Sequence, residues 1–456
     1  MRKTTASGRF TEWFVFIALA VTYAFFWQGA SSEGVSRFAA SFGLATSASP
    51  TIDPFSSSTN DTVFASGHFY STHGLGLSLL ALPVVAVFQG TWGLENILRT
   101  PGRAELAYAL ATVFVVCLLC ASSSAAFRRL LLHFRPTLTP RASLGITLLV
   151  YLGTPFLCYS TVFAGPAVAG ALLTWAAWFA LGDSLKSVVT RSILFQVAVA
   201  LAVLVESRAC FLVPALVAYL YQPRPTRRFR FQFPLIYIAV IFIGWWAYKS
   251  VASTPLSVNW NGLWTLWVGG RQGLLLYCPL AGLAIWGCVK ATGPAREFLF
   301  AVLLGVVGIY LSSIFFPTTS SFAGPREFVL AIPFLFIGLA FLPLGARVFQ
   351  LYGLLATLSI SIAVVLTVVT PTVPADDPAP LWNTIGHGLT TGRVSMNPQG
   401  VLTPADKFGA RWVHPELHTR VSRNLGELMG LRSWFSVIPL LLFWLLARYL
   451  VVPKLT

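Results

Sequence analysis

The segment from residue 51 to residue 83 concentrates reactive side chains in a chain in which only 10% of the residues are charged. It holds two carboxylates, two imidazoles and a phenol, namely Asp53, Asp61, His68, His73 and Tyr70. A carboxylate or an imidazole can take a proton from a hydroxyl group, and a protonated imidazole can hold an anion. This segment is therefore the first candidate for an active site.

The elements that must position this segment are apolar. The chain has 456 residues, of which 56% are hydrophobic and 14% aromatic, and its mean hydropathy is +0.74. A soluble core cannot bury so much apolar surface, and the apolar runs are long enough to cross a bilayer. The net charge of +16 would fit a nucleic-acid-binding protein, but the basic residues are scattered between apolar runs and form no single patch. The composition predicts an all-α polytopic integral membrane protein.

The apolar runs predict about twelve transmembrane helices. They lie near residues 12–29, 104–126, 142–159, 164–181, 192–207, 209–221, 233–250, 272–289, 297–316, 327–344, 349–370 and 434–451. If the N-terminus is cytoplasmic, most basic residues fall in cytoplasmic loops that hold few acids, whereas the charges on the opposite side nearly balance. This asymmetry predicts that both termini are cytoplasmic and that the segment 51–83 faces the other side of the membrane.

One apolar stretch, Leu75 to Phe88, does not fit as a span because it would invert the charge asymmetry of the loops that follow. It is predicted to lie at the outer interface or to re-enter the membrane. The apolar stretch after Arg2 and Lys3 is interpreted as an uncleaved signal-anchor, with a cleaved signal peptide as the alternative. The chain then divides into a transmembrane module (1–370) with a first outer loop (28–103), a last outer loop (371–433), and a final span with its tail (434–456).

Several classes of function lack their sequence signatures. The chain contains no phosphate-binding P-loop, no dinucleotide fingerprint and no HExxH, which argues against ATP-driven transport and zinc proteolysis. All six cysteines fall in or beside predicted spans, where a thiol behaves as a small apolar group, and they imply neither a disulfide framework nor a zinc site. No cofactor is expected, and a divalent metal is possible but not favoured.

Further polar residues are predicted at the outer ends of other spans. Arg326 and Arg271 stand at span entrances, where an arginine binds phosphate through its two-pronged guanidinium or extends to the lipid headgroups. Glu206 either takes part in chemistry or neutralises Arg208 across a helix end. Trp264 fits an aromatic belt at the membrane interface or a surface that stacks on a sugar ring.

Several motifs in this order resemble bacterial GT-C glycosyltransferases of the protein mannosyltransferase and aminoarabinose transferase type. The first motif is Gly67-His68-Phe69-Tyr70-Ser71-Thr72-His73-Gly74-Leu75-Gly76, where relatives often read G-x-Y-Y-S-D-K-x-P-G. It is followed by Glu206 at a span end, Gly273 to Pro279, Phe322-Ala323-Gly324-Pro325-Arg326, and Asn424-Leu425-Gly426. The usual Lys is His73 here, and the usual Pro is Leu75.

This resemblance implies a transferase that passes a sugar from a polyprenyl phosphate to a glycan, lipid or protein acceptor at the extracytoplasmic face of the bacterial inner membrane. Such an enzyme needs a base for the acceptor hydroxyl and cations for the leaving phosphate. Asp53 or Asp61 is the expected base, with Asp53 favoured by its position early in the loop; each also suits a turn or a helix cap.

The other predicted roles follow from the same reaction. Donor phosphate or lipid would contact His73, Arg326, Arg271 and Tyr70, and substrate would contact His68, Glu206 and Trp264. The expected partners are the lipid-linked sugar donor, the acceptor and membrane lipids, and no nucleic acid. A polytopic transporter or lipid flippase is the main alternative, because such proteins also have about twelve spans and charges within the membrane. A non-catalytic scaffold in envelope assembly is a third.

Overall fold

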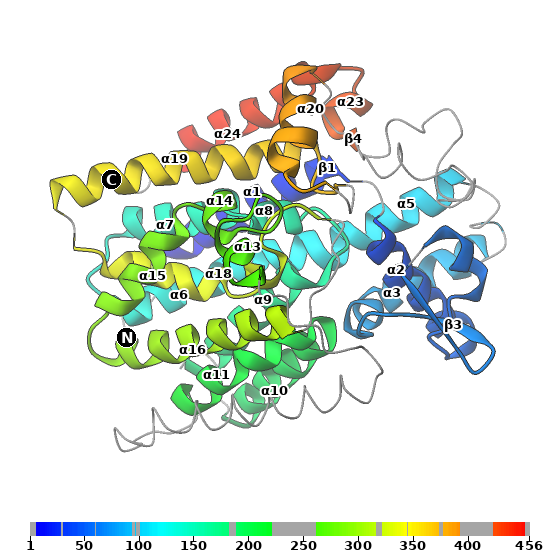
Figure 1. Cartoon of the computed structure of the whole chain (residues 1–456), viewed down its shortest axis with the longest axis horizontal. Coiled ribbons are helices and arrows are strands. Elements are labelled where there is room, and N and C mark those ends of the chain that lie inside the picture. Colours follow the sequence, from blue (N-terminus) through cyan, green and yellow to red (C-terminus); the bar gives the residue numbers. More distant parts are fainter. Residues whose placement is uncertain are drawn as a thin grey trace.

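The computed structural model describes residues 6–28, 31–59, 61–93, 96, 101–181, 188–220, 261–315, 322–343, 345–373, 377–392 and 423–451. This part of the chain is largely helical, as Figure 1 shows. Two small antiparallel sheets accompany the helices: β1 (Phe26–Trp27) pairs with β4 (Arg423–Asn424), and β2 (Thr62–Ala65) pairs with β3 (His68–Ser71). The helical character predicted from composition is confirmed.

The longer helices follow the predicted apolar runs. They are α1 (Ala6–Phe25), α5 (Pro101–Ala111), α6 (Leu118–Phe134), α7 (Pro140–Leu152), α9 (Gly165–Leu181), α10 (Val188–Val205), α11 (Val213–Leu220), α15 (Ala281–Lys290), α16 (Pro294–Phe315), α19 (Ala346–Val369) and α24 (Ile438–Val451). Shorter helices are α8 (Phe156–Tyr159), α13 (Gly262–Val268), α14 (Leu274–Tyr277), α17 (Arg326–Val329), α18 (Ile332–Phe336), α20 (His387–Thr390) and α23 (Leu425–Leu428). Short 3₁₀ or π segments are η2 (Thr112–Cys117), η3 (Ser207–Phe211), η4 (Ile337–Phe341), η5 (Leu381–Gly386) and η7 (Ser433–Val437).

Within the described residues, three helices are long and apolar enough to cross a membrane: Arg103–Phe134, Pro294–Phe315 and Ala346–Val369. They correspond to the predicted spans near 104–126, 297–316 and 349–370. Most other predicted spans coincide with shorter apolar helices, the one near 233–250 lies outside the described residues, and the count of about twelve stays a prediction. In α19 only 33% of the apolar window is buried, so the exposed Leu351, Leu354 and Leu358 form a face suited to lipid.

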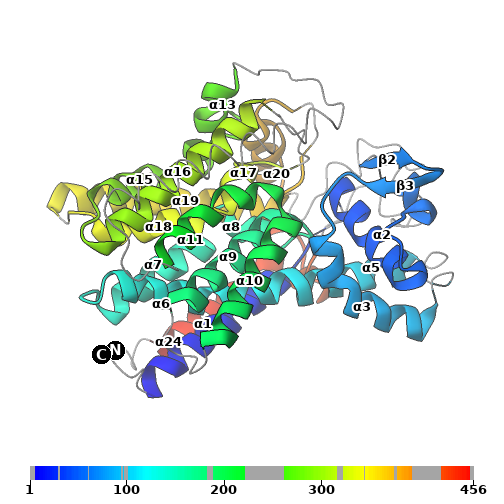
Figure 2. The same ribbon diagram turned by 90° about the horizontal axis from the view of Figure 1, so that it is seen from below.

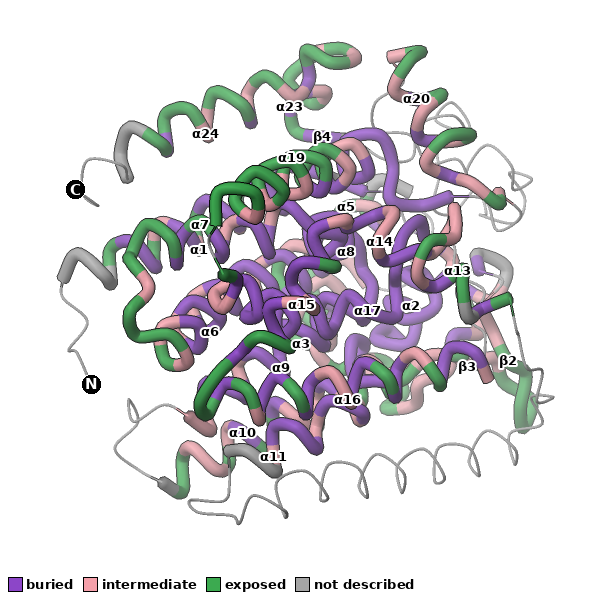
Figure 3. Tube along the Cα trace, turned by 60° about the vertical axis from the view of Figure 1, so that its left-hand side comes forward, coloured by how far each residue is buried: buried purple, intermediate pink, exposed green. Residues whose placement is uncertain are grey.

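The centre of the molecule is built on small residues. Helix α9 has the sequence GPAVAGALLTWAAWFAL and packs between α6 and α10, with Gly165 to Ala171 entirely buried. Small side chains let neighbouring helices approach closely, which is how helices associate where lipid gives no hydrophobic driving force. Figure 3 shows the result, with α8 and α17 buried inside and α24 exposed along the outside.

The first predicted outer loop folds into a group of elements at one end of the molecule (Figures 1 and 2). The group comprises α2 (Ser32–Ser47), the 3₁₀ turn η1 (Asp53–Ser58), the β2–β3 hairpin and α3 (Gly76–Trp92). The hairpin turns at Ser66 and Gly67, both with positive φ, which is the backbone that two-residue hairpins favour. Helix α3 covers the stretch expected at the interface, and it packs against α2, α5 and α10.

The first and last parts of the described chain lie together. The two residues after α1 pair with the two residues before α23, and Nε1 of Trp444 in α24 donates to Oγ1 of Thr22 in α1 at 3.0 Å. The start of α1 and the end of α24 therefore lie at the same end of the molecule, as Figure 2 shows, whereas α2 begins at the opposite end of α1.

Candidate functional site

Helix α2, which follows α1, places a carboxylate and a guanidinium on one face, namely those of Glu33 and Arg37. Ser31 caps the helix because its side chain accepts from the N–H of Gly34 at 3.0 Å. Glu33 follows in the first turn, where a negative charge is favourable, and Arg37 lies one turn later, with Nη2 2.9 Å from the Glu33 carboxylate. Both side chains are buried.

Asp61 reaches this helix from the start of the hairpin. Its carboxylate accepts hydrogen bonds from Ser36 in α2 at 2.6 Å and from the hydroxyl of Thr72 just after β3. Nε2 of His73 lies 3.0 Å from the same carboxylate. Side chains before and after the hairpin thus meet on α2 because β3 folds back along β2.

The charged side chains of Glu33, Arg37 and Asp61 form a cluster on α2. The glycines of the segment after β3 let His73 reach this cluster. A Cβ on Gly74 would lie 2.3 Å from the carbonyl oxygen of Leu204, and one on Gly76 would lie 2.3 Å from the backbone nitrogen of Val205. Only glycine permits such contact between backbones. The segment therefore lies directly against the end of α10, one residue before Glu206.

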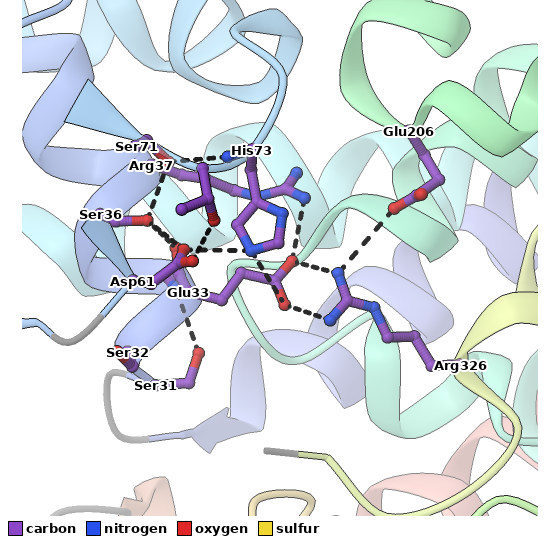
Figure 4. Close-up of polar contacts among 12 residues, drawn as sticks. Ser31, Ser32, Glu33, Ser36, Arg37, Asp61, Ser71, His73, Glu206 and Arg326 are labelled. Atoms are coloured by element: carbon purple, nitrogen blue, oxygen red, sulfur yellow. Dashed lines mark hydrogen bonds and ion pairs between the residues drawn. The ribbon is translucent and has the colours of Figure 1, made fainter. Parts of the chain in front are cut away.

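Arg326 enters the cluster from the far half of the chain, as Figure 4 shows. It begins α17 after Gly324, whose φ of +95° favours glycine. Its Nη1 lies 2.7 Å from Oε2 of Glu33, and its Nη2 donates to Oε1 of the same residue at 2.8 Å. Glu206 lies 4.0 Å from Nη2. A second pair, Arg208 and Glu327 at 3.3 Å, lies alongside.

Electrostatics keep the carboxylates of the cluster ionised. Burial raises the pKa of Asp61, but the hydrogen bond and charge of His73, with the hydroxyls of Ser36 and Thr72, hold that pKa well below its ordinary value. Burial also opposes ionisation of Glu33, whose pKa is nevertheless lowered by Arg326, His73 and Arg37. The cluster therefore offers an ionised carboxylate beside buried cations. A carboxylate can accept a proton from a hydroxyl group, and the cations can stabilise a departing anion.

Asp53 belongs to a separate, more exposed pair. Its carboxylate lies 2.7 Å from Nδ1 of His68 and accepts from the N–H of Phe69 at 2.7 Å, and these two contacts lower its pKa. The Asp53 side chain is 40% exposed. It contacts the first residues of β3, whereas Asp61 contacts residues just after that strand, about 10 Å further along. Two of the predicted residues thus pair with each other away from the cluster.

Three other predicted residues have no described contact that joins them to the cluster. Arg271 donates to the carbonyl of Asp377 at 2.8 Å and accepts from the N–H of Gly324 at 2.9 Å, so it links the last outer loop to the segment before Arg326. Tyr70 is half-buried on β3. Trp264 on α13 is 75% exposed, which suits either an interfacial belt or a surface for a sugar.

The sequence analysis missed two residues of the cluster, Glu33 and Arg37. Two signals were readable: a serine pair before an acid, typical of a helix start, and a Glu–Arg spacing of four residues, typical of a helical ion pair. Their contact with Arg326, 293 residues from Glu33, carried no local signal. Among the described residues, no group of three or more His, Cys, Asp or Glu is arranged to hold a metal ion.

Comparisons with known proteins give one match. No protein-family model and no curated protein matches the chain. Among solved structures, it is similar to the crystal structure of ArnT from Cupriavidus metallidurans in the apo state, with a TM-score of 0.42 and 14% identity, over 85% of this chain and 72% of that chain.

Proposed function

We propose that this protein is a membrane glycosyltransferase that moves a sugar from a polyprenyl-phosphate donor to an acceptor hydroxyl on the extracytoplasmic side. The observation that carries the proposal is that Asp61, His73 and, through Glu33, Arg326 form one connected cluster at the loop end of an apolar helical body. Asp61 and His73 remain accessible, with side chains 18% and 23% exposed, whereas Arg326 is buried behind them. An acceptor can therefore reach the carboxylate while the donor phosphate is held deeper.

In the proposed reaction, the acceptor oxygen attacks the anomeric carbon and the bond from that carbon to the phosphate oxygen breaks. The bonding electrons leave with the phosphate, and the acceptor proton passes to Asp61. A carboxylate with a lowered pKa is a weak base, so the proton moves late, as the new C–O bond makes the hydroxyl strongly acidic. Arg326 and His73 stabilise the charge that develops on the phosphate.

The remaining predicted residues take supporting roles in this proposal. Glu206, 4.0 Å from Nη2 of Arg326, helps to orient this guanidinium toward the site. Asp53, favoured from sequence, becomes the rival base, because its pair with His68 lies at the exposed end of β3. Arg271, Tyr70 and Trp264 would contact donor or acceptor from the loops around the cluster. The donor lipid and the acceptor are the proposed partners, and the inner membrane of a bacterium the proposed location.

The two carboxylates provide the test. In proteoliposomes supplied with lipid-linked sugar extracted from the host membrane, Asp61→Asn should lower the rate of transfer by about 10²- to 10⁴-fold, because a positioned base contributes about that much. Asp53→Asn should stay within a few-fold of the wild type. Lipid profiling of a deletion strain would identify the donor, which should accumulate. If both variants transfer sugar at the wild-type rate, the catalytic assignment is wrong.

A further inference from the structure

The cations that the proposed reaction needs are already occupied by a carboxylate of the protein itself. Figure 4 shows Glu33 between Arg37 and Arg326. One carboxylate oxygen lies 2.9 Å from Nη2 of Arg37 and 2.8 Å from Nη2 of Arg326, and the other lies 2.7 Å from Nη1 of Arg326. This two-pronged contact is the one that a guanidinium makes with phosphate.

We propose that Arg37 and Arg326 together bind the phosphate of the donor, and that Glu33 occupies this site in the unliganded protein and is displaced when the donor enters. This inference rests on the proposed function and adds to it a further phosphate ligand, Arg37, beside Arg326 and His73, and an internal competitor, Glu33. Arg37 was not recognised in the sequence.

Two buried polar atoms beside the arginines support a ligand that is larger than a carboxylate. Within the described part of the chain, Nε of Arg37 and the hydroxyl of Tyr159 are buried with no hydrogen-bond partner. Tyr159 interacts electrostatically with both Arg326 and Glu33. Buried polar atoms are rarely left without partners, because each loses its bonds to water. A phosphate has more acceptor oxygens than the two of Glu33, so it can serve donors that Glu33 leaves unused.

The backbone around Arg37 fixes the position of its guanidinium group. A Cβ on Gly165, the first residue of α9, would lie 2.6 Å from Nη1 of Arg37, and the same nitrogen donates to the carbonyl of Val205 at 3.1 Å. The guanidinium is therefore held against two backbones, so it can stay in place when its anion is exchanged. Glu33 stands in the first turn of α2 and has His73 3.8 Å away as an alternative partner.

The exchange conserves charge. A polyprenyl-phosphate sugar is a phosphodiester with one negative charge, and it replaces one carboxylate with one negative charge. Two buried guanidinium groups without an anion would be costly, so the site favours having one occupant or the other. No bond is made or broken in this step.

The test compares binding of farnesyl phosphate, a short prenyl phosphate without sugar, to the wild type and to Glu33→Gln at about pH 5, where this monoester carries about one negative charge, as the donor does. Glutamine keeps the size of the side chain but removes the competing charge, so the affinity for farnesyl phosphate should rise at least about tenfold. Without ligand the variant should melt at a lower temperature, and farnesyl phosphate should raise that temperature more than it does for the wild type. An unchanged or weaker affinity of Glu33→Gln would overturn the inference.

A matched control is Glu12→Gln. Glu12 is also a buried glutamate in a two-pronged pair, with Arg129, but it lies in α1 away from the site. This variant should lose stability without gaining affinity; an equal gain would mean that the effect is not local and would overturn the inference. If Glu33→Gln does not fold, Glu33→Asp replaces it, since the shorter side chain keeps the charge but weakens the contact and should also raise the affinity.

Binding and sugar transfer separate the two proposals. Wild-type transfer activity combined with no gain of affinity in Glu33→Gln would reject the displacement of Glu33 and leave the transferase standing. A gain of affinity in a protein that transfers no sugar from any lipid donor would support the phosphate site and reject the transferase. Adding Arg37→Ala to Glu33→Gln should abolish the gain of affinity for farnesyl phosphate. If the double variant keeps the gain, Arg37 does not bind the phosphate.

Discussion

Burial favours phosphate binding over membrane anchoring, the two interpretations of Arg326 that the sequence left open, and the role of this residue stays a prediction. An arginine that anchors to lipid headgroups keeps its charged end at the surface, whereas Arg326 is 5% exposed and paired with Glu33. A group so placed acts on whatever anion enters the cluster. The same reasoning separates Asp61, half-buried beside hydroxyls and an imidazole, from the more exposed Asp53.

Substitutions at Arg326 should therefore change sugar transfer as expected for a phosphate ligand, and not as expected for a membrane anchor. Arg326→Ala should weaken donor use about 10- to 150-fold, because a hydrogen bond to a charged group contributes about 1.5–3 kcal/mol. Arg326→Lys keeps the charge but loses the two-pronged geometry, so it should recover only part of the activity. The donor dependence of transfer in reconstituted membranes measures both, with the exposed Arg347→Lys as a control without effect. Full activity of Arg326→Lys would contradict phosphate binding.

The lowered pKa of Asp61 predicts how its contribution to stability depends on pH. Its folded pKa lies below the ordinary value of 3.8, so ionised Asp61 stabilises the protein above about pH 4, and this contribution is lost as the pH falls through the folded pKa. The difference in melting temperature between the wild type and Asp61→Asn should be constant above about pH 5 and shrink below about pH 4. Melting curves in detergent from pH 3 to pH 7 would show it, and a difference that grows in acid would contradict it.

Among the secondary-structure elements, those that depend on a local pattern of residues could be predicted from the sequence. The long apolar helices and the helix after His73 follow from hydropathy alone. The hairpin between Asp61 and His73 was not predicted, because its strands are short and one of them, Thr62–Ala65, is mostly exposed. Without the hairpin, Asp53 and Asp61 look alike, as two loop acids next to turn-forming residues. Their difference in burial comes from β3 folding back onto α2, which no local pattern encodes.

The contact between α3 and α10 has its own test in two glycines of α3. Gly76→Ala would place a Cβ 2.3 Å from Val205, so the backbone must shift, at a cost of about 1–3 kcal/mol, and His73 would shift with it. Gly90→Ala on the same helix meets nothing within 4 Å and should leave stability unchanged or raise it by up to about 1 kcal/mol. Thermal unfolding and transfer rates measure the two effects. Equal stability of both variants would contradict the close packing.

For the whole molecule, the cluster lies at the end of α1 opposite to the end where the start of α1 and the end of α24 lie together. The charge asymmetry of the loops predicts the cluster on the extracytoplasmic side. A cysteine replacing the exposed Ala65 in the hairpin should then react with a membrane-impermeant maleimide in intact cells, and one replacing the exposed Thr137 between α6 and α7 should not. The six native cysteines would be replaced first. Labelling at Thr137 alone would invert the orientation.

The pairing of Glu33 with Arg326 also sets the order in which the site is completed during synthesis. The two residues are 293 positions apart, which at about 5–20 residues per second separates their emergence from the ribosome by roughly 15–60 s. The β1–β4 pair closes later still, when residue 424 arrives. Through this interval the acid of α2 must be held by Arg37, by His73 or by water. A nascent chain that stalls before Arg326 would therefore carry the proposed base without the complete proposed phosphate site.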